Sequence, residues 1–312
     1  MSIKTPVAFL IFNRPEVTAR VFQAIAQAKP AKLLVVADGP RSAAEAEKCE
    51  RTRAVIRSVD WDCEVLTDFS EANLGCKRRV ASGISWVFSQ VEEAIILEDD
   101  CLPVLSFFRF CEELLQIYRD DERVMHIGGN NFLPEQFPIA DSYYFSKYIF
   151  PWGWGTWRRA WASYDEAMKS WPEFKRTNLM RNIFDNPEER LLWAQRFDMA
   201  FNGEIDTWDF QWFYHCWSQN GLGISPRVNM VSNLGFHAEA THTKTAHEKG
   251  ILANRPAVEV DGDLLHPQFV VERKDADAYV FENCFRPNQS QPTERLGEKI
   301  VRYARRLPSR ER

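Results

Sequence analysis

Three adjacent carboxylates follow a short apolar run in the first third of the chain. Residues 94–97 read Ala-Ile-Ile-Leu, and Glu98, Asp99 and Asp100 come directly after them. Adjacent carboxylates repel one another, so placing them at the end of a buried strand is costly unless a cation compensates the charge. Mg²⁺ and Mn²⁺ favour such oxygen ligands together with substrate phosphates. A solvated acidic loop, with Asp100 capping the next helix, is the alternative that the spacing leaves open.

The elements that would position this triplet form a repeating pattern. Apolar runs predict strands at 6–12, 32–37, 63–66 and 94–97. Because helical stretches separate them, we expect βαβ units and an α/β fold with a mostly parallel sheet and helices on both faces. Ligands of such sheets bind beyond the carboxyl ends of the strands. Polar residues follow all four runs, although turns also favour Asn and Asp for backbone reasons: Arg14, Asp38, Asn73 and the acidic triplet.

A basic run lies just beyond one of these strand ends. Lys77, Arg78 and Arg79 follow Asn73-Leu74-Gly75 at the expected start of a helix. Basic side chains beside a glycine turn at a helix start can contact a diphosphate, which makes Lys77 a candidate ligand of a nucleotide. A solvated helix face is an equally good explanation for Arg78 and Arg79.

Tryptophan is concentrated in the second half of the chain. Nine of the eleven tryptophans fall between Trp152 and Trp217. Indole rings stack on the C–H faces of sugars, and their N–H groups hydrogen-bond hydroxyls. Trp152, Trp154 and Trp157 alternate with small residues, which predicts a tight loop at a cleft, and we place Trp152, Trp154 and Trp208 near that cleft. The remaining members of this set are expected to include core residues: Trp161, Trp171, Trp193 and Trp217.

Histidines offer at most one metal ligand. His237, His242 and His247 recur at intervals of five in a Thr-rich stretch that is typical of a loop, and this spacing does not place all three on one helical face. A three-histidine zinc site is therefore not expected. His237, just after Asn-Leu-Gly-Phe, is the candidate for a single ligand. His126 and His215 lie in apolar segments and are expected in the core.

Composition excludes several classes of protein. The chain has 312 residues and a formal net charge of −5, which fits two domains or one large one and disfavours nucleic acid as the main partner. Its longest apolar run, 7–12, is too short to span a membrane, and no segment predicts export. Seven scattered cysteines without a CxxC pair are typical of reduced thiols, so we expect a cytoplasmic protein.

The last nineteen residues, 294–312, are locally basic, with seven basic and three acidic side chains. Such a segment can lie on the anionic inner face of a membrane, where it would bring an enzyme to a lipid-linked acceptor. A frayed, solvated terminus is the alternative.

Several of these patches resemble one enzyme family. Residues 95–100, followed by Ser106-Phe107-Phe108, resemble the acidic motif of GT-A nucleotide-sugar glycosyltransferases. They look most like the Glu-Asp-Asp version in the N-acetylglucosaminyltransferase I family and related bacterial sugar transferases. Residues 6–14 look like the first strand of that family with its nucleotide-contacting Arg, and 35–38 like its second strand with a uracil-contacting Asp. Trp208-Asp209 is similar to its Trp-Asp pair, in which the Asp is the catalytic base.

The resemblance implies a Rossmann-like GT-A fold and an inverting transfer from a nucleotide sugar. Mn²⁺ or Mg²⁺, held mainly by Asp100, would offset the charge that the departing nucleoside diphosphate gains. Asp209 would accept the proton of the attacking hydroxyl, and its apolar neighbours would exclude water. A carboxylate stabilised by the helix dipole is the structural alternative for Asp209, and we expect Asp206 to be the better cap of that helix.

We therefore predict three parts: a nucleotide-sugar and metal-binding half at 1–131, an acceptor-binding half with the base at 132–250, and a C-terminal extension at 251–312. The expected function is metal-dependent, inverting transfer of a hexosyl or N-acetylhexosaminyl group, from a UDP-sugar first of all, to a glycan or glycolipid hydroxyl. One alternative is a sugar-phosphate nucleotidyltransferase, which the lack of a basic, glycine-rich phosphate loop disfavours. The other is a non-catalytic carbohydrate-binding protein.

Overall fold

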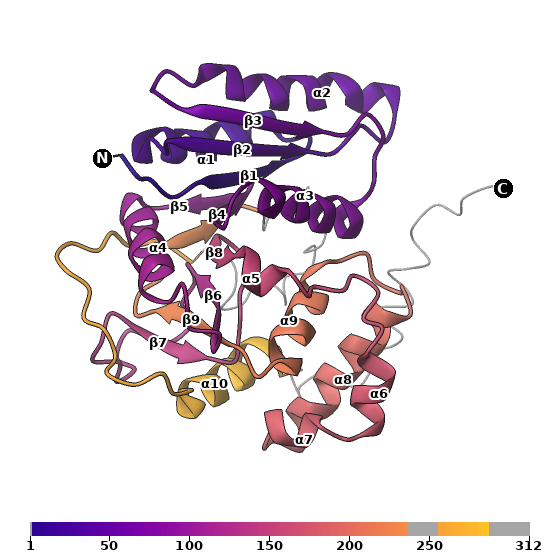
Figure 1. Cartoon of the computed structure of the whole chain (residues 1–312), viewed down its shortest axis with the longest axis vertical. Helices are drawn as coiled ribbons and strands as arrows, with labels where there is room; N and C mark the ends of the chain where they lie inside the picture. The colour runs from indigo at the N-terminus through magenta and orange to yellow at the C-terminus, as the bar shows by residue number, and fades with distance from the viewer. Residues whose placement is uncertain (1, 236–254, 287–312) are drawn as a thin grey trace.

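A single large sheet organises the part of the chain that the computed structural model describes, residues 2–235 and 255–286. Helices pack against both of its faces (Figure 1). The predicted α/β class and the helices on both faces are confirmed. The eight strands stand in the spatial order β3 (Glu64–Phe69), β2 (Lys32–Ala37), β1 (Val7–Ile11), β4 (Glu93–Glu98), β8 (Trp154–Trp157), β6 (Val124–Gly128), β9 (Leu222–Pro226) and β7 (Tyr143–Ser146).

The first four strands in sequence run parallel to one another at one side of this sheet. β1 pairs in parallel with both β2 and β4, and β2 pairs in parallel with β3. Ile11 lies opposite Ala37, and Leu10 lies opposite Glu98. The carboxyl ends of β1, β2 and β4 therefore meet at one edge, which is where the sequence places its polar residues.

The remaining strands make the sheet mixed rather than mostly parallel. β8 is antiparallel to both β4 and β6, and β7 is antiparallel to β9, whereas β6 and β9 are parallel. The prediction of a tight loop at Trp154 and Trp157 is wrong, because both residues belong to β8 in the middle of the sheet. The two indoles point into opposite cores, and Gly155 leaves room for the side chain of Leu115.

The two faces of the sheet carry separate cores. Val7, Phe9 and Ile11 face the core that contains α1 (Pro15–Ala28) and α4 (Leu105–Ile117). Ala8 and Leu10 face the other core, because side chains of a strand alternate between the two faces. The second core contains α3 (Cys76–Gln90) and most of the tryptophans. Its further helices are α5 (Arg158–Trp161), α8 (Pro187–Phe201), α9 (Asp209–Ser218) and α10 (Lys274–Val280).

Short elements complete the described fold. α2 (Ala43–Ala54) packs against α1 and continues into a 3₁₀ turn, Val55–Ser58. A π-helical turn, Phe281–Phe285, follows α10. Residues 158–196 form several short helices instead of one long one: α5, α6 (Trp171–Arg176), α7 (Met180–Ile183) and the start of α8. Met168 and Asn178 adopt left-handed backbone angles between these helices, and Pro187 opens α8.

Local contacts determine the chain after β7 and β6. β7 ends at Ser146, because the next backbone N–H groups, of Lys147 and Tyr148, donate to the side chains of Asp277 and Ser146. Gly129, which follows β6, allows close packing of the protein itself, since a Cβ there would lie 2.4 Å from a methyl group of Val231.

The tryptophans and histidines predicted to be core residues are buried, which confirms those predictions: Trp161, Trp171, Trp193, Trp217, His126 and His215. All seven cysteines are free. Across 2–235 and 255–286, the structure contains no helix with both the length and the apolar character needed to cross a bilayer.

Buried His126 makes the stability of the fold sensitive to acid. Its ring stacks on Trp154 with centroids 4.9 Å apart, and it accepts a hydrogen bond of 3.3 Å from the Trp212 indole. Burial lowers the pKa of His126 to about 3 from an ordinary 6.5. Between pH 6.5 and about pH 3 the imidazole is protonated in the unfolded chain but stays neutral in the folded chain. Stability is therefore lost as the pH falls through this range.

We expect His126→Gln to reduce this acid sensitivity, because glutamine keeps a donor and an acceptor but does not titrate. Between about pH 6 and pH 4 the unfolding free energy of the variant should fall less steeply, by up to roughly 1.4 kcal/mol per pH unit. Urea titrations at several pH values measure both slopes. Equal slopes for the variant and the wild type would contradict the role given to His126.

Candidate functional site

An arginine and two carboxylates connect the ends of β1 and β4. Arg14 Nη1 lies 2.8 Å from Asp100 Oδ2 and 3.3 Å from Asp99 Oδ1. The Phe12 backbone N–H donates to Asp99 Oδ2 over 3.2 Å. Burial lowers the pKa of the Arg14 guanidinium, but the neighbouring carboxylates outweigh this effect and raise it, so the side chain stays charged. The two predicted groups, Arg14 and the acidic triplet, are therefore in direct contact.

If all three carboxyls of the acidic triplet were ionised, they would carry more negative charge than Arg14 can compensate. Burial raises the pKa of Asp99 to about 7, although the charge of Arg14 acts in the opposite direction. Burial and then repulsion from Asp100, Asp99 and Asp209 raise the pKa of Glu98 well above its usual range. This edge of the sheet therefore has the electrostatic character of a site that binds a further cation.

Asp209 joins this group from the second half of the chain. It is the first residue of α9, and its Oδ1 accepts hydrogen bonds from the Thr207 hydroxyl and, over 2.9 Å, from the Phe210 backbone N–H. The half-buried side chain interacts electrostatically with Glu98, which lies at the end of β4. The structure thus brings the predicted base to the edge where the acidic triplet lies.

Cys76, which the sequence analysis did not single out, stands among these carboxylates. Burial and then the charges of Glu98, Asp209, Asp206 and Asp100 raise the pKa of its thiol. The thiol is therefore neutral, and carboxylates from both halves of the chain act on it electrostatically. Nothing in the sequence around Cys76 could indicate this, because the carboxylates come from two distant segments.

Asp206 caps a different helix from the one expected. Its Oδ1 accepts the Lys77 backbone N–H over 3.1 Å, at the start of α3. The expectation that it caps the helix at 209 is wrong, since α9 begins without a side-chain cap. A Cβ on Gly75 would lie 3.0 Å from the Asp206 carboxylate. Because Gly75 has no side chain, Asp206 from the second half of the chain can approach and cap the N-terminus of α3 in the first half.

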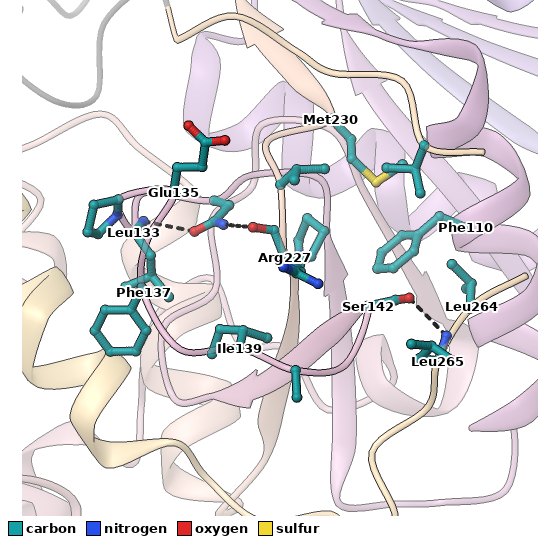
Figure 2. Close-up of a pocket in the computed structure, with 16 residues that line it drawn as sticks. Phe110, Leu133, Glu135, Phe137, Ile139, Ser142, Arg227, Met230, Leu264 and Leu265 are labelled. Carbon is teal, nitrogen blue, oxygen red and sulfur yellow. Dashed lines mark hydrogen bonds between the residues drawn. The ribbon is translucent and has the colours of Figure 1, made fainter. Parts of the chain in front are cut away.

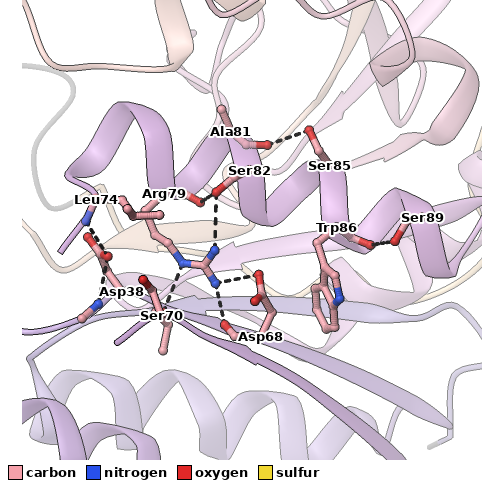
Figure 3. A network of polar contacts seen from close by, with 12 residues as sticks. Asp38, Asp68, Ser70, Leu74, Arg79, Ala81, Ser82, Ser85, Trp86 and Ser89 are labelled. Carbon is pink, nitrogen blue, oxygen red and sulfur yellow. Dashed lines mark hydrogen bonds and ion pairs between the residues drawn. The ribbon is translucent and has the colours of Figure 1, made fainter. Parts of the chain in front are cut away.

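Asp38 and Asn73 lie in contact, as the candidate site requires. The Asp38 carboxylate is nevertheless occupied by nearby backbone groups, among them the Leu74 N–H (Figure 3). Its buried carboxylate accepts four hydrogen bonds of 2.9 to 3.1 Å. A carboxylate offers about four acceptor positions. Asp38 could therefore accept a hydrogen bond from the base of a nucleotide only after one of its present bonds had opened. The four donors are the backbone N–H groups of Gly39, Leu74 and Gly75 and the Asn73 amide.

The basic run of α3 divides into three different environments. Arg79 is buried and donates to the Ala37 carbonyl over 3.1 Å and to the Asp68 carboxylate over 2.8 Å (Figure 3). It therefore anchors α3 to β2 and β3, and of the two explanations left open for Arg79 the solvated face is wrong. Arg78 is exposed, whereas the half-buried Lys77 stands at the start of the helix, beside Asp206.

A small two-stranded sheet fixes the residues that follow the triplet. β5 (Cys101–Pro103) pairs antiparallel with β10 (Val231–Asn233), and the Leu234 N–H donates to the Asp100 carbonyl over 2.7 Å. Gly235 lies so close to Asp100 that a Cβ there would be 2.4 Å from Asp100 Oδ2. Gly235, the last described residue before 236–254, therefore lies next to Asp100. His237 lies outside the described residues, as do the C-terminal basic residues.

The tryptophans named as acceptor contacts are more buried than expected. Trp154 has no exposed surface, Trp208 is 3% exposed, and their rings stack with centroids 5.7 Å apart. Neither presents a face on which a sugar could stack. Trp152 is half-buried and packs against Phe132 and Phe150. Of the three, only Trp152 has surface available to a ligand.

A cavity of about 310 Å³ contains none of these candidate residues (Figure 2). Its wall is mostly apolar, with Glu135 and Arg227 as its charged members, and the Ser142 hydroxyl there accepts the Leu265 N–H over 2.8 Å. Such a wall offers no set of groups for a nucleoside diphosphate, so we do not assign the nucleotide to it. Among the described residues, no group of three or more His, Cys, Asp or Glu side chains is arranged as a metal cage.

Comparisons with solved structures give a likeness of fold, whereas comparisons of the sequence find no match. No protein-family model matches the chain, and no curated protein matches it significantly. The chain is similar to a solved structure described as the crystal structure of GalNAc-T7 with UDP, GalNAc and Mn²⁺, with 10% sequence identity and a TM-score of 0.41. The match covers 72% of this chain and 43% of that one, so the chain spans less than half of that protein. At this level of similarity the activity of that protein does not transfer to this chain.

We expect Asp38→Ala to destabilise the protein, because it leaves several buried donors without an acceptor. The unfolding free energy should fall by roughly 1–3 kcal/mol or more in urea titrations at neutral pH. Asp38→Asn is the matched control, since it keeps one acceptor oxygen and should lose less. Unchanged stability in the alanine variant would show that the carboxylate does not hold this loop.

Proposed function

We propose that the chain is a metal-dependent, inverting GT-A glycosyltransferase that uses a nucleotide-diphosphate sugar, with UDP-sugar the leading donor. The observation that carries this proposal is the convergence of the acidic triplet, Arg14 and Asp209 at the carboxyl edge of β1 and β4. These residues come from both halves of the chain, and the excess negative charge calls for a cation. The family resemblance of the same short stretches supports it.

The residues at this edge fit a hard divalent cation. Carboxylate oxygens are the ligands that Mg²⁺ and Mn²⁺ prefer, and both ions use one or two of them together with substrate phosphates. Asp100 would hold the ion, with His237 as a further candidate ligand. Once bound, the ion would supply Lewis-acid stabilisation of a departing diphosphate.

The first half of the chain would hold the donor. Arg14 carries a permanent positive charge at the end of β1 and can pair with a phosphate. Lys77 adds a second cation at the start of α3, whose N-terminus itself favours an anion. Asn73 completes this candidate set, together with Glu98 and Asp99. Asp38 would hold the loop that contains Asn73. A direct contact of Asp38 with the nucleotide base would require one of its present hydrogen bonds to open.

Asp209 would act as the base on the acceptor side. The Thr207 hydroxyl and the Phe210 N–H both donate to Oδ1, which orients the carboxylate and leaves Oδ2 to accept the proton of an attacking hydroxyl. Trp208 and Phe210 on either side limit the access of water, which would otherwise compete as acceptor. The acceptor would be a hydroxyl of a glycan or glycolipid, and Trp152 is the aromatic with surface left to contact it.

The proposal as a whole is tested by incubation with a panel of nucleotide sugars and Mn²⁺. Slow donor hydrolysis or transfer to an added glycan is expected. Calorimetry with UDP, GDP and dTDP, with and without metal, measures donor binding directly. If none of the three binds in a metal-dependent way, the proposed function is wrong.

For the base, we expect Asp209→Asn to bind UDP as the wild type does and to lose transfer by about 10²- to 10⁴-fold, because the amide cannot accept the proton. Steady-state transfer rates and calorimetry report the two properties separately. Asp198→Asn is the matched control, since that carboxylate pairs with Lys175 outside the cluster. Full transfer by Asp209→Asn would remove the assignment.

For the metal, we expect Asp100→Asn to weaken metal-dependent binding of UDP about tenfold or more, since a neutral amide is a poorer ligand of a hard cation. When a chelator removes the metal, UDP should bind equally well to the wild type and to Asp100→Asn. Asp120→Asn, at an exposed position, controls for the change in net charge. An unchanged metal dependence in Asp100→Asn would exclude this carboxylate as the ligand.

A further inference from the structure

Arg196 of α8 is enclosed by aromatic rings instead of carboxylates. Its guanidinium carbon lies 4.8 Å from the ring centroid of Trp193, 5.0 Å from that of Phe285 and 5.7 Å from that of Phe210. The three rings come from α8, from the turn after α10 and from α9. We refer to these three rings and Arg196 as the arginine cage.

No carboxylate in 2–235 and 255–286 lies within ion-pair distance of Arg196, although Asp209 acts on it from farther away. Neither an ion pair nor a hydrogen bond joins it to another described side chain, whereas the Arg residues at positions 41, 119, 123 and 176 all pair with a carboxylate. Burial lowers the pKa of Arg196 to about 10, so the side chain is still a cation at neutral pH. A half-buried cation without an anion is a costly arrangement that an anionic ligand would relieve.

The arginine cage lies beside the proposed base. Phe210 forms one of its walls and directly follows Asp209, to whose carboxylate it donates its N–H. The charge of Asp209 also acts on Arg196. Arg196, Phe210 and Asp209 are all half-buried, so each keeps some surface toward solvent. A ligand that presents a hydroxyl to Asp209 would therefore extend into the reach of Arg196.

We propose that Arg196 binds an anionic group, a carboxylate or a phosphate, on the acceptor. This inference rests on the proposed function, because it places the acceptor at Asp209. Arg196 would act as a specificity residue that selects acidic acceptors over neutral ones, and the flat rings around it would hold its guanidinium plane in place. Guanidinium groups pair with carboxylate and phosphate oxygens through two parallel hydrogen bonds, which makes such selection strong.

Calorimetry on the full chain with UDP and Mn²⁺ tests this selection. The probes are methyl glucuronide, which carries a carboxylate, glucose 6-phosphate and the neutral methyl glucoside. Wild-type protein should bind at least one anionic probe about ten- to a hundredfold more tightly than the neutral one. The two anionic probes distinguish a carboxylate from a phosphate. Equal affinity for all three would overturn the inference.

Variants of Arg196 separate ligand binding from packing. Arg196→Gln should bind UDP normally and lose the preference for anionic probes, and Arg196→Lys should keep part of it. Arg190→Gln, on the same helix, is the matched control and should keep the full preference, because Arg190 donates to the Phe184 carbonyl instead. If Arg196→Gln keeps the preference, Arg196 serves only to pack the rings and the inference is wrong.

The wild-type protein provides a measurement that needs no variant to fold. Its preference for the anionic probe should shrink as ionic strength rises, since the contact is between charges near the surface. A preference that salt does not change would also count against Arg196. Loss of UDP binding by the wild type would instead contradict the proposed function, so the two failures can be told apart.

Discussion

The contact of Arg14 with Asp99 and Asp100 is the interaction on which the arrangement of this protein depends. Parallel strands place their carboxyl ends side by side, and β4 ends in three acidic residues next to β1. Without a cation at the end of β1, these carboxylates would meet only one another in a region with little water. Arg14 lets the two central strands end together, but one positive charge does not balance three negative ones.

That imbalance links the first half of the molecule to the second. Asp206 and Asp209, at the start of α9, bring two more carboxylates toward the same region. Asp206 is compensated by the start of α3, whose N–H groups and dipole favour a negative charge. Asp209 keeps a carboxylate oxygen that its neighbours in the loop do not use. The two carboxylates therefore differ in their surroundings: Asp206 is held by the start of α3, whereas Asp209 keeps an oxygen free of these local contacts.

Much of the sheet edge formed by β1, β2 and β4 could be predicted because its signals are local. A short apolar run followed by polar turn residues is visible in the sequence at Arg14, Asp38 and the triplet, and the strands that precede them form as expected. The role of Asp38 was less visible, since three of its four hydrogen bonds come from residues 73–75, which are far away in the sequence. The same holds for Asp206, which caps a helix more than a hundred positions earlier. Local patterns carry no information about such partners.

The tryptophan-rich region shows a different limit of sequence interpretation. Alternation of Trp with Gly and Thr fits a tight loop as well as a strand with large and small side chains in turn, and only the sheet decides between them. β8 lies between β4 and β6, so Trp154 and Trp157 had to fill both cores. Arg196 was missed for a related reason. Its three aromatic neighbours belong to separate helical segments, and their meeting depends on packing across the whole second half.

The central position of β8 also bears on how the chain folds. Four parallel strands are complete once β4 has been synthesised, but one edge of β4 then has no partner until residues 154–157 have followed. An unpaired edge of an apolar strand readily joins the strands of other chains. Pairing across such a sequence separation is also slow, because the intervening chain must first be ordered. We therefore expect the interval between β4 and β8 to be the stage of synthesis at which this protein is most prone to aggregate.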